Sequence, residues 1–161
     1  MFAIFEKLKS EDLKTQELSS IDKAILISTL LVECARSDDN FTDTEKEQIK
    51  KILKNKLHLD SSEVEKCFET ANESSEKSIE IYSLTKEIRD NFDKDEILFI
   101  FELLWKIILS DGVIDDFESS MMTKLTGLFH LTGKENAEAK KNAQTALNLY
   151  KNQIYAFLIF F

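Results

Sequence analysis

Two short segments of this 161-residue chain gather carboxylates at spacings that could hold a hard cation. The first is Ser-Asp-Asp-Asn-Phe-Thr-Asp-Thr-Glu at residues 37–45, and the second is Ser-Asp-Gly-Val-Ile-Asp-Asp-Phe-Glu at residues 110–118. Carboxylate oxygens are the ligands that Ca²⁺, Mg²⁺ and Mn²⁺ prefer in proteins. The candidate metal ligands are the acidic residues that recur at equivalent places in both segments: Asp38, Asp43, Glu45, Asp111, Asp116 and Glu118.

Helix capping is the competing explanation for some of these carboxylates. Thr42-x-x-Glu45 has the form of a capping box, and Asp115 with Glu118 has the same spacing. Such side chains satisfy backbone N–H groups at the start of a helix and interact favourably with its dipole. We therefore expect Glu45 and Glu118 to be helix caps in the first place and metal ligands only in the second.

Asp38 and Asp111 are different, because each follows the C-terminal end of an expected helix, where the helix dipole disfavours an anion. Capping does not explain them, which favours a ligand or loop-bonding role. An EF-hand is excluded, since that loop requires glycine at its sixth position and glutamate at its twelfth. Counted from either aspartate, neither position holds the required residue.

The histidines and cysteines, the other residues that could take part in chemistry, are interpreted as structural. His58 and His130 lack partners at zinc-ligand spacing, so we interpret them as packing or helix-end residues. Cys34 lies on an apolar helical face and is interpreted as a small buried hydrophobe, and Cys67 need not form a disulfide with it. The sequence contains no phosphate-binding loop, nucleophile triad or zinc motif, so we expect a protein that is not an enzyme.

The elements that position these segments repeat along the chain. An offset of 73 residues places Ile27, Leu30 and Leu31 on equivalent apolar residues, and Ser37-Asp38 on Ser110-Asp111. Each copy reads as an apolar helix, an acidic corner, an amphipathic helix and a third helix. We expect one domain over residues 1–161, with repeat one at about 20–72, a linking helix at about 76–91, repeat two at about 93–150 and an apolar tail at 151–161.

Composition agrees with this organisation. The chain has no proline and three glycines, which leaves few signals for hairpins, and its apolar periodicity predicts an all-α bundle of seven or eight helices related by a pseudo-two-fold axis. A net charge of −9 repels nucleic acid and anionic lipid and favours cations or a basic protein partner. With no apolar stretch of signal-peptide length at the start, we place the protein in the cytoplasm.

The last eight residues, 154–161, are all apolar, yet a membrane span needs about 20. One interpretation is a final helical segment docked on the core. The alternatives are contact with a partner or with a membrane surface, which would make the protein peripheral at the inner membrane, or an aggregation-prone end.

Residues 30–45 and 103–118, each running from Leu-Leu through an apolar helix to a Ser-Asp corner, resemble the TerB-like (tellurite resistance protein B) family. The resemblance covers about residues 20–140. It implies an all-α fold, a bacterial stress or membrane-linked setting, and acidic residues suspected of binding metal or a partner, and it implies no established reaction.

Two functional hypotheses follow from these observations. The first is a stress-response module whose acidic corners bind a divalent cation or a basic partner surface. The second is a structural protein–protein interaction or co-chaperone-like module in which the carboxylates serve only as caps. Neither predicts a particular oligomeric state.

Overall fold

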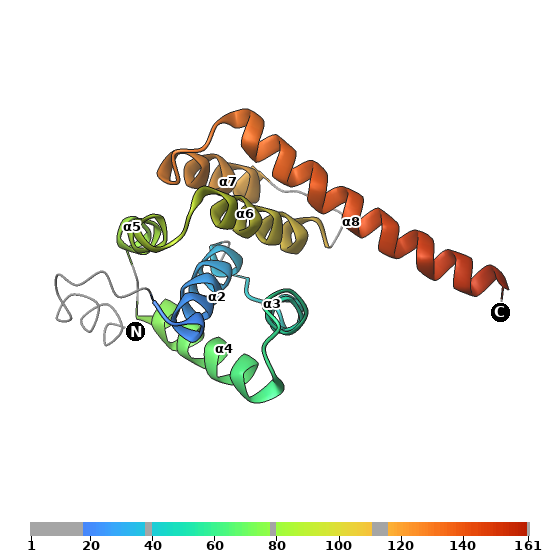
Figure 1. Cartoon of the computed structure of the whole chain (residues 1–161), viewed down its shortest axis with the longest axis horizontal. Coiled ribbons are helices and arrows are strands. Elements are labelled where there is room, and N and C mark those ends of the chain that lie inside the picture. The colour runs from blue at the N-terminus through green and yellow to red at the C-terminus, as the bar shows by residue number, and fades with distance from the viewer. Residues whose placement is uncertain (1–17, 38–39, 78–79, 111–115, 161) are drawn as a thin grey trace. The chain divides into compact units, whose positions relative to one another are not determined.

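The computed structural model describes residues 18–37, 40–77, 80–110 and 116–160, without the side chains of residues 150 and 160. This part of the chain contains seven α-helices and no strand, which confirms the predicted all-α class (Figure 1). The helices are α2 (Ser20–Arg36), α3 (Asp43–Lys56), α4 (Ser61–Glu76), α5 (Ile81–Asn91), α6 (Lys94–Leu109), α7 (Asp116–Leu128) and α8 (Gly133–Phe160).

Packing divides the chain into two compact units, residues 1–93 and 94–161. The boundary falls between Asp93 and Lys94, where the sequence predicts the start of the second repeat. In the first unit α2 packs most extensively on α4, and in the second α6 packs most extensively on α8. The first and third helices of each predicted repeat are therefore the main packing partners within their own unit.

The first unit is built around α2. Ser19 caps this helix, its hydroxyl oxygen accepting a hydrogen bond from the Asp22 N–H at 3.2 Å. Two buried hydroxyls on α2 are satisfied within the helix, since Ser28 donates to the Ala24 carbonyl at 2.6 Å and Thr29 to the Ile25 carbonyl at 2.7 Å. The apolar face of α2 can thus be buried without unsatisfied polar groups. That face comprises Ala24, Ile25, Leu26, Ile27, Leu30, Leu31, Val32 and Ala35.

The second unit buries the apolar face of α6. Phe101 and Phe129 meet edge to face, with ring centroids 5.6 Å apart. The indole N–H of Trp105 donates a 2.9 Å hydrogen bond to Asn136 at the start of α8. Small side chains at Ala139 and Ala143 are the buried positions of α8 and let this helix approach α6 closely.

Two predicted boundaries differ from the structure. The linking helix, α5, begins at Ile81 rather than near residue 76, because Glu76 is the last residue of α4. The predicted tail at 151–161 does not begin with a break, since α8 runs without interruption from Gly133 to Phe160. No glycine or proline lies between residues 134 and 160, so the chain has no local signal to end this helix earlier.

Candidate functional site

The first acidic corner leads into α3, and one of its carboxylates is committed to capping. The Thr42 hydroxyl accepts a hydrogen bond from the Glu45 N–H at 3.1 Å, and the Thr42 N–H donates to the Glu45 carboxylate at 3.4 Å. This pair of bonds confirms the capping box predicted from Thr42-x-x-Glu45. Glu45 therefore holds the start of α3 and is not free to turn toward a ligand.

Asp43, a second carboxylate of the first corner, is exposed to solvent, whereas Glu45 is part of the capping box. Its side chain is 99% exposed, and the nearest cation, Lys46, lies 3.7 Å away on the same helix. An exposed pair of this kind is worth about 0–1 kcal/mol. Asp43 can therefore exchange Lys46 for another cation at little energetic cost.

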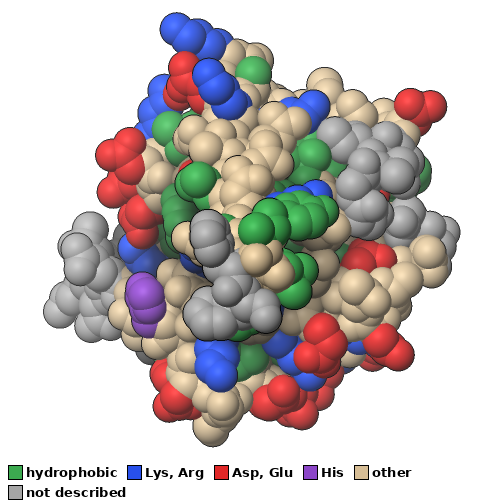
Figure 2. Space-filling model, turned by 90° about the vertical axis from the view of Figure 1, so that its right-hand side faces the viewer, with side chains coloured by type: hydrophobic (Ala, Val, Ile, Leu, Met, Phe, Trp, Pro, Cys, Tyr) green, Lys and Arg blue, Asp and Glu red, His purple; other side chains and the backbone are tan. Residues whose placement is uncertain are grey.

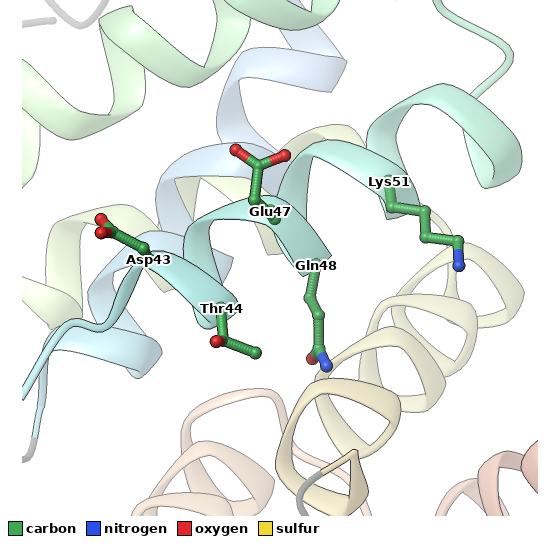
Figure 3. A pocket seen from close by; sticks show the side chains of 5 residues that line it. All are labelled: Asp43, Thr44, Glu47, Gln48 and Lys51. Atoms are coloured by element: carbon green, nitrogen blue, oxygen red, sulfur yellow. The ribbon is translucent and has the colours of Figure 1, made fainter.

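A shallow hollow of about 380 Å³ lies along α3 and is lined by Asp43, Thr44, Glu47, Gln48 and Lys51. Figure 3 shows the carboxylates of Asp43 and Glu47 pointing away from Thr44 and Gln48. Groups that diverge in this way do not surround one point, as the oxygens around a metal ion do. The hollow is lined by residues of one helix and is not a preformed ion cage.

Cations stacked on aromatic rings hold the first corner in place. The Phe41 ring lies 5.4 Å from the Arg36 guanidinium and 5.3 Å from the Lys46 ammonium. Arg36 also donates hydrogen bonds to Asn72 at 3.0 Å and Glu76 at 3.3 Å, both on α4. These contacts fasten the end of α2 and the segment before α3 to α4. The sequence analysis missed them, and the only available signal was an aromatic residue in a polar corner.

The second corner is described from Asp116 onward. Asp116 is exposed on the first turn of α7, and Glu118 is half-buried two residues later. Asp38, Asp111 and Asp115 lie outside the described residues, so four of the six predicted ligands are placed, two in each unit. Among the residues that the structure describes, no three His, Cys, Asp or Glu side chains form a group that could hold a metal ion.

The two histidines are helix-end residues. His58 and His130 both have φ of 56°, the left-handed conformation in which a chain leaves a helix. After α7 the His130 N–H donates to the Gly127 carbonyl at 3.1 Å and the Leu131 N–H to the Thr126 carbonyl at 3.0 Å, which is the Schellman pattern. The helix-end role predicted from the sequence is confirmed.

The two cysteines are free thiols that their surroundings keep protonated. Burial, and secondarily the Glu33 carboxylate, raise the pKa of the Cys34 thiol to about 12, although part of the residue is exposed. Burial likewise raises the pKa of Cys67, which is fully buried. Because the thiolate is the nucleophilic form, neither cysteine is activated for covalent chemistry.

The described residues thus form an all-helical, acidic protein that exposes carboxylates at the start of α3 and of α7. The family model described as tellurite resistance protein TerB matches residues 24–141, which is well over half of the chain. The chain therefore belongs to the TerB family, as the resemblance in the sequence predicted. The comparison with curated proteins found no match, and neither did the comparison with solved structures.

Proposed function

We propose that this protein is a non-enzymatic TerB-family module of a bacterial stress response, acting in the cytoplasm, whose acidic corners bind the basic surface of a partner protein. The observation that carries the proposal is the division of roles at the first corner. Glu45 is held in the capping box, whereas Asp43 is 99% exposed and only loosely paired. The raised pKa of Cys34 and the helix-end role of the histidines support a binding role over a catalytic one.

Charge complementarity favours a basic surface as the partner. The chain carries a net charge of −9, which attracts cationic surfaces and speeds their encounter. A single exposed ion pair contributes about 0.2–1 kcal/mol, so useful affinity requires several pairs made together. A partner surface with several lysines or arginines meets this requirement.

A fluorescently labelled lysine-rich peptide is a defined probe for this activity. We expect the double variant Asp43→Asn/Asp116→Asn to bind it several-fold more weakly than the native chain, with a shallower dependence on salt, as measured by fluorescence anisotropy. The matched control is Glu69→Gln/Glu138→Gln, which removes one exposed carboxylate from each unit away from the corners. Equal losses in both double variants, or no loss in either, would contradict binding at the corners.

A divalent cation is the second candidate ligand, and it is favoured by the oxygen donors that Asp43 and Asp116 expose at the first turns of α3 and α7. An ion held by the native state raises the melting temperature in proportion to the logarithm of its concentration above Kd. Melting curves with millimolar Ca²⁺, Mg²⁺, Mn²⁺ or Zn²⁺ test this ligand. An absent shift, or the same shift in Asp43→Asn/Asp116→Asn protein, would rule the cation out.

The stress-response role has a separate test in cells. Expression of this chain in a tellurite-sensitive bacterium should raise the tellurite concentration that stops growth, and the Asp43→Asn/Asp116→Asn variant should do so less. Clustered carboxylates repel an oxyanion, so the expected route is a protein partner and not direct capture of tellurite. If the variant protected the cells fully, the cellular role would not depend on the acidic corners.

A further inference from the structure

Only the first half of α8 is packed. Its buried and half-buried side chains after the first turn recur every three or four residues, as expected for one face of a helix lying on α6. These side chains are Asn136, Ala139, Lys140, Ala143, Ala146 and Leu147. From Asn148 to Ile159 every side chain that the structure describes is exposed, which favours the alternatives to docking of this segment on the core.

The exposed half of α8 is also the most apolar exposed surface among the described residues. Six large hydrophobic side chains lie in this segment with exposed fractions between 42% and 77%: Leu149, Ile154, Tyr155, Phe157, Leu158 and Ile159. Figure 2, viewed from the side on which α8 ends, shows hydrophobic side chains on that surface. The patch therefore requires a partner that removes it from water.

The distribution of these side chains around the helix identifies the kind of partner. Successive residues are turned by about 100°, so the six consecutive apolar residues from Ile154 to Ile159, Ala156 included, place apolar side chains all round the axis. A second helix, or a groove in a protein, covers one side of such a segment and leaves the other in water. A helix that is apolar all round is covered completely only by a surrounding apolar phase, such as lipid.

The described part of this segment is nearly uncharged. Residues 149–159 form eleven residues of helix, about 16 Å long. Lys151 is the one charged residue in this range. None of the helices in the described ranges is long and apolar enough to cross a membrane.

We propose that residues 149–159 of α8 insert into the hydrocarbon region of a bilayer of zwitterionic lipids and hold this protein at the membrane surface. The net charge of −9 disfavours an anionic surface, so binding relies on apolar burial and not on electrostatic attraction. Tyr155 and Phe157 are aromatic side chains of the kind that anchor proteins at membrane interfaces. The inference rests on α8 alone and does not depend on what the acidic corners bind.

Flotation of the full chain with phosphatidylcholine vesicles tests the proposal. We expect the native protein to float with these vesicles, and to float less with phosphatidylglycerol vesicles at low salt. The triple variant Tyr155→Ser/Phe157→Ser/Ile159→Ser should partition at least tenfold more weakly. Its melting temperature should match the native value, because all three side chains are exposed.

Tyr82→Ser/Phe117→Ser is the matched control, since it removes two exposed aromatic side chains that lie outside α8. This variant should float like the native protein. In a Phe157→Trp variant, phosphatidylcholine brominated in its acyl chains should quench the added fluorescence above the native background. Equal loss in the control, absence of flotation, or tighter binding to phosphatidylglycerol would overturn the proposal. So would concentration-dependent dimerisation that the triple variant abolishes while flotation is unchanged.

Discussion

His58 adopts a left-handed backbone conformation although it has a side chain, and this places a small strain at the end of α3. The conformation costs an L-residue about 1–2 kcal/mol, whereas glycine adopts it freely. The sequence analysis could interpret both histidines as packing or helix-end residues because they lack partners at zinc-ligand spacing. It could not derive their backbone angles, since histidine is not the residue that usually signals this turn.

Replacement of His58 by glycine should therefore stabilise the protein. The His58→Gly variant relieves the strain but enlarges the freedom of the unfolded chain, and the balance should raise the free energy of unfolding by up to about 1 kcal/mol. The melting temperature should then rise by about 2–4 °C in thermal denaturation followed by circular dichroism. His58→Ala keeps the strain and should give no gain. A fall in stability for His58→Gly would contradict this account.

Capping was the part of the fold that the sequence predicted most directly. The caps act between residues three apart, so the pattern of hydroxyl or carboxylate followed by glutamate is sufficient to find them. Reciprocal hydrogen bonds confirm the predicted box at Thr42–Glu45, and the same pattern forms boxes at Asp60–Glu63 and Thr132–Glu135. The contacts of Arg36 with Asn72 and Glu76 span 36 and 40 residues, and only the packing of α2 on α4 brings them together.

The candidate site could also be predicted only in part, because its caps are local patterns whereas its other contacts depend on how the helices pack. Glu45 was expected to cap before it could bind, and the structure confirms its cap. That Asp43 points outward depends on the helical phase of α3, which buries Ile49 and Leu53 and leaves Asp43 in solvent. No pattern in the sequence indicated that Phe41 would be covered by Arg36 and Lys46.

Substitutions at neighbouring positions of α3 should separate these two roles. Thr42→Ala removes the acceptor for the Glu45 N–H and should lower the free energy of unfolding by about 1 kcal/mol. Asp43→Asn removes an exposed charge near the positive end of the helix dipole and should cost less than about 0.5 kcal/mol. Urea denaturation measures both. Equal losses would mean that Asp43 is a structural residue and weaken its assignment as a ligand.

At the scale of the whole molecule, the predicted repeat indicated the order of helices and a boundary near residue 93, but not the extent of α8. The correspondence between the two copies reaches the start of the third helix, Asp60-x-x-Glu63 and Thr132-x-x-Glu135, and not its far end, so the first copy could not indicate how far the second would continue. Helix α4 ends after 16 residues, whereas α8 continues for 28.

A chain ending at Asn148 should melt within about 1 °C of the full chain, because no described side chain beyond that point is buried. A chain ending at Asn142 is the matched control. It loses Ala143, Ala146 and Leu147 from the face that lies on α6 and should melt several degrees lower. Calorimetry of the three chains makes the comparison. A large loss on removal of 149–161 alone would show that the segment supports the fold.

Because α8 is continuous, the segment proposed to enter lipid and the segment that lies on α6 form a single stiff rod of about 42 Å. A flexible linker would let the second unit tumble above the bilayer. A rod transmits its own tilt to the unit, so the direction in which residues 149–159 enter the bilayer also fixes which side of α6 and α7 faces the lipid headgroups. Membrane attachment would then set an orientation as well as a location.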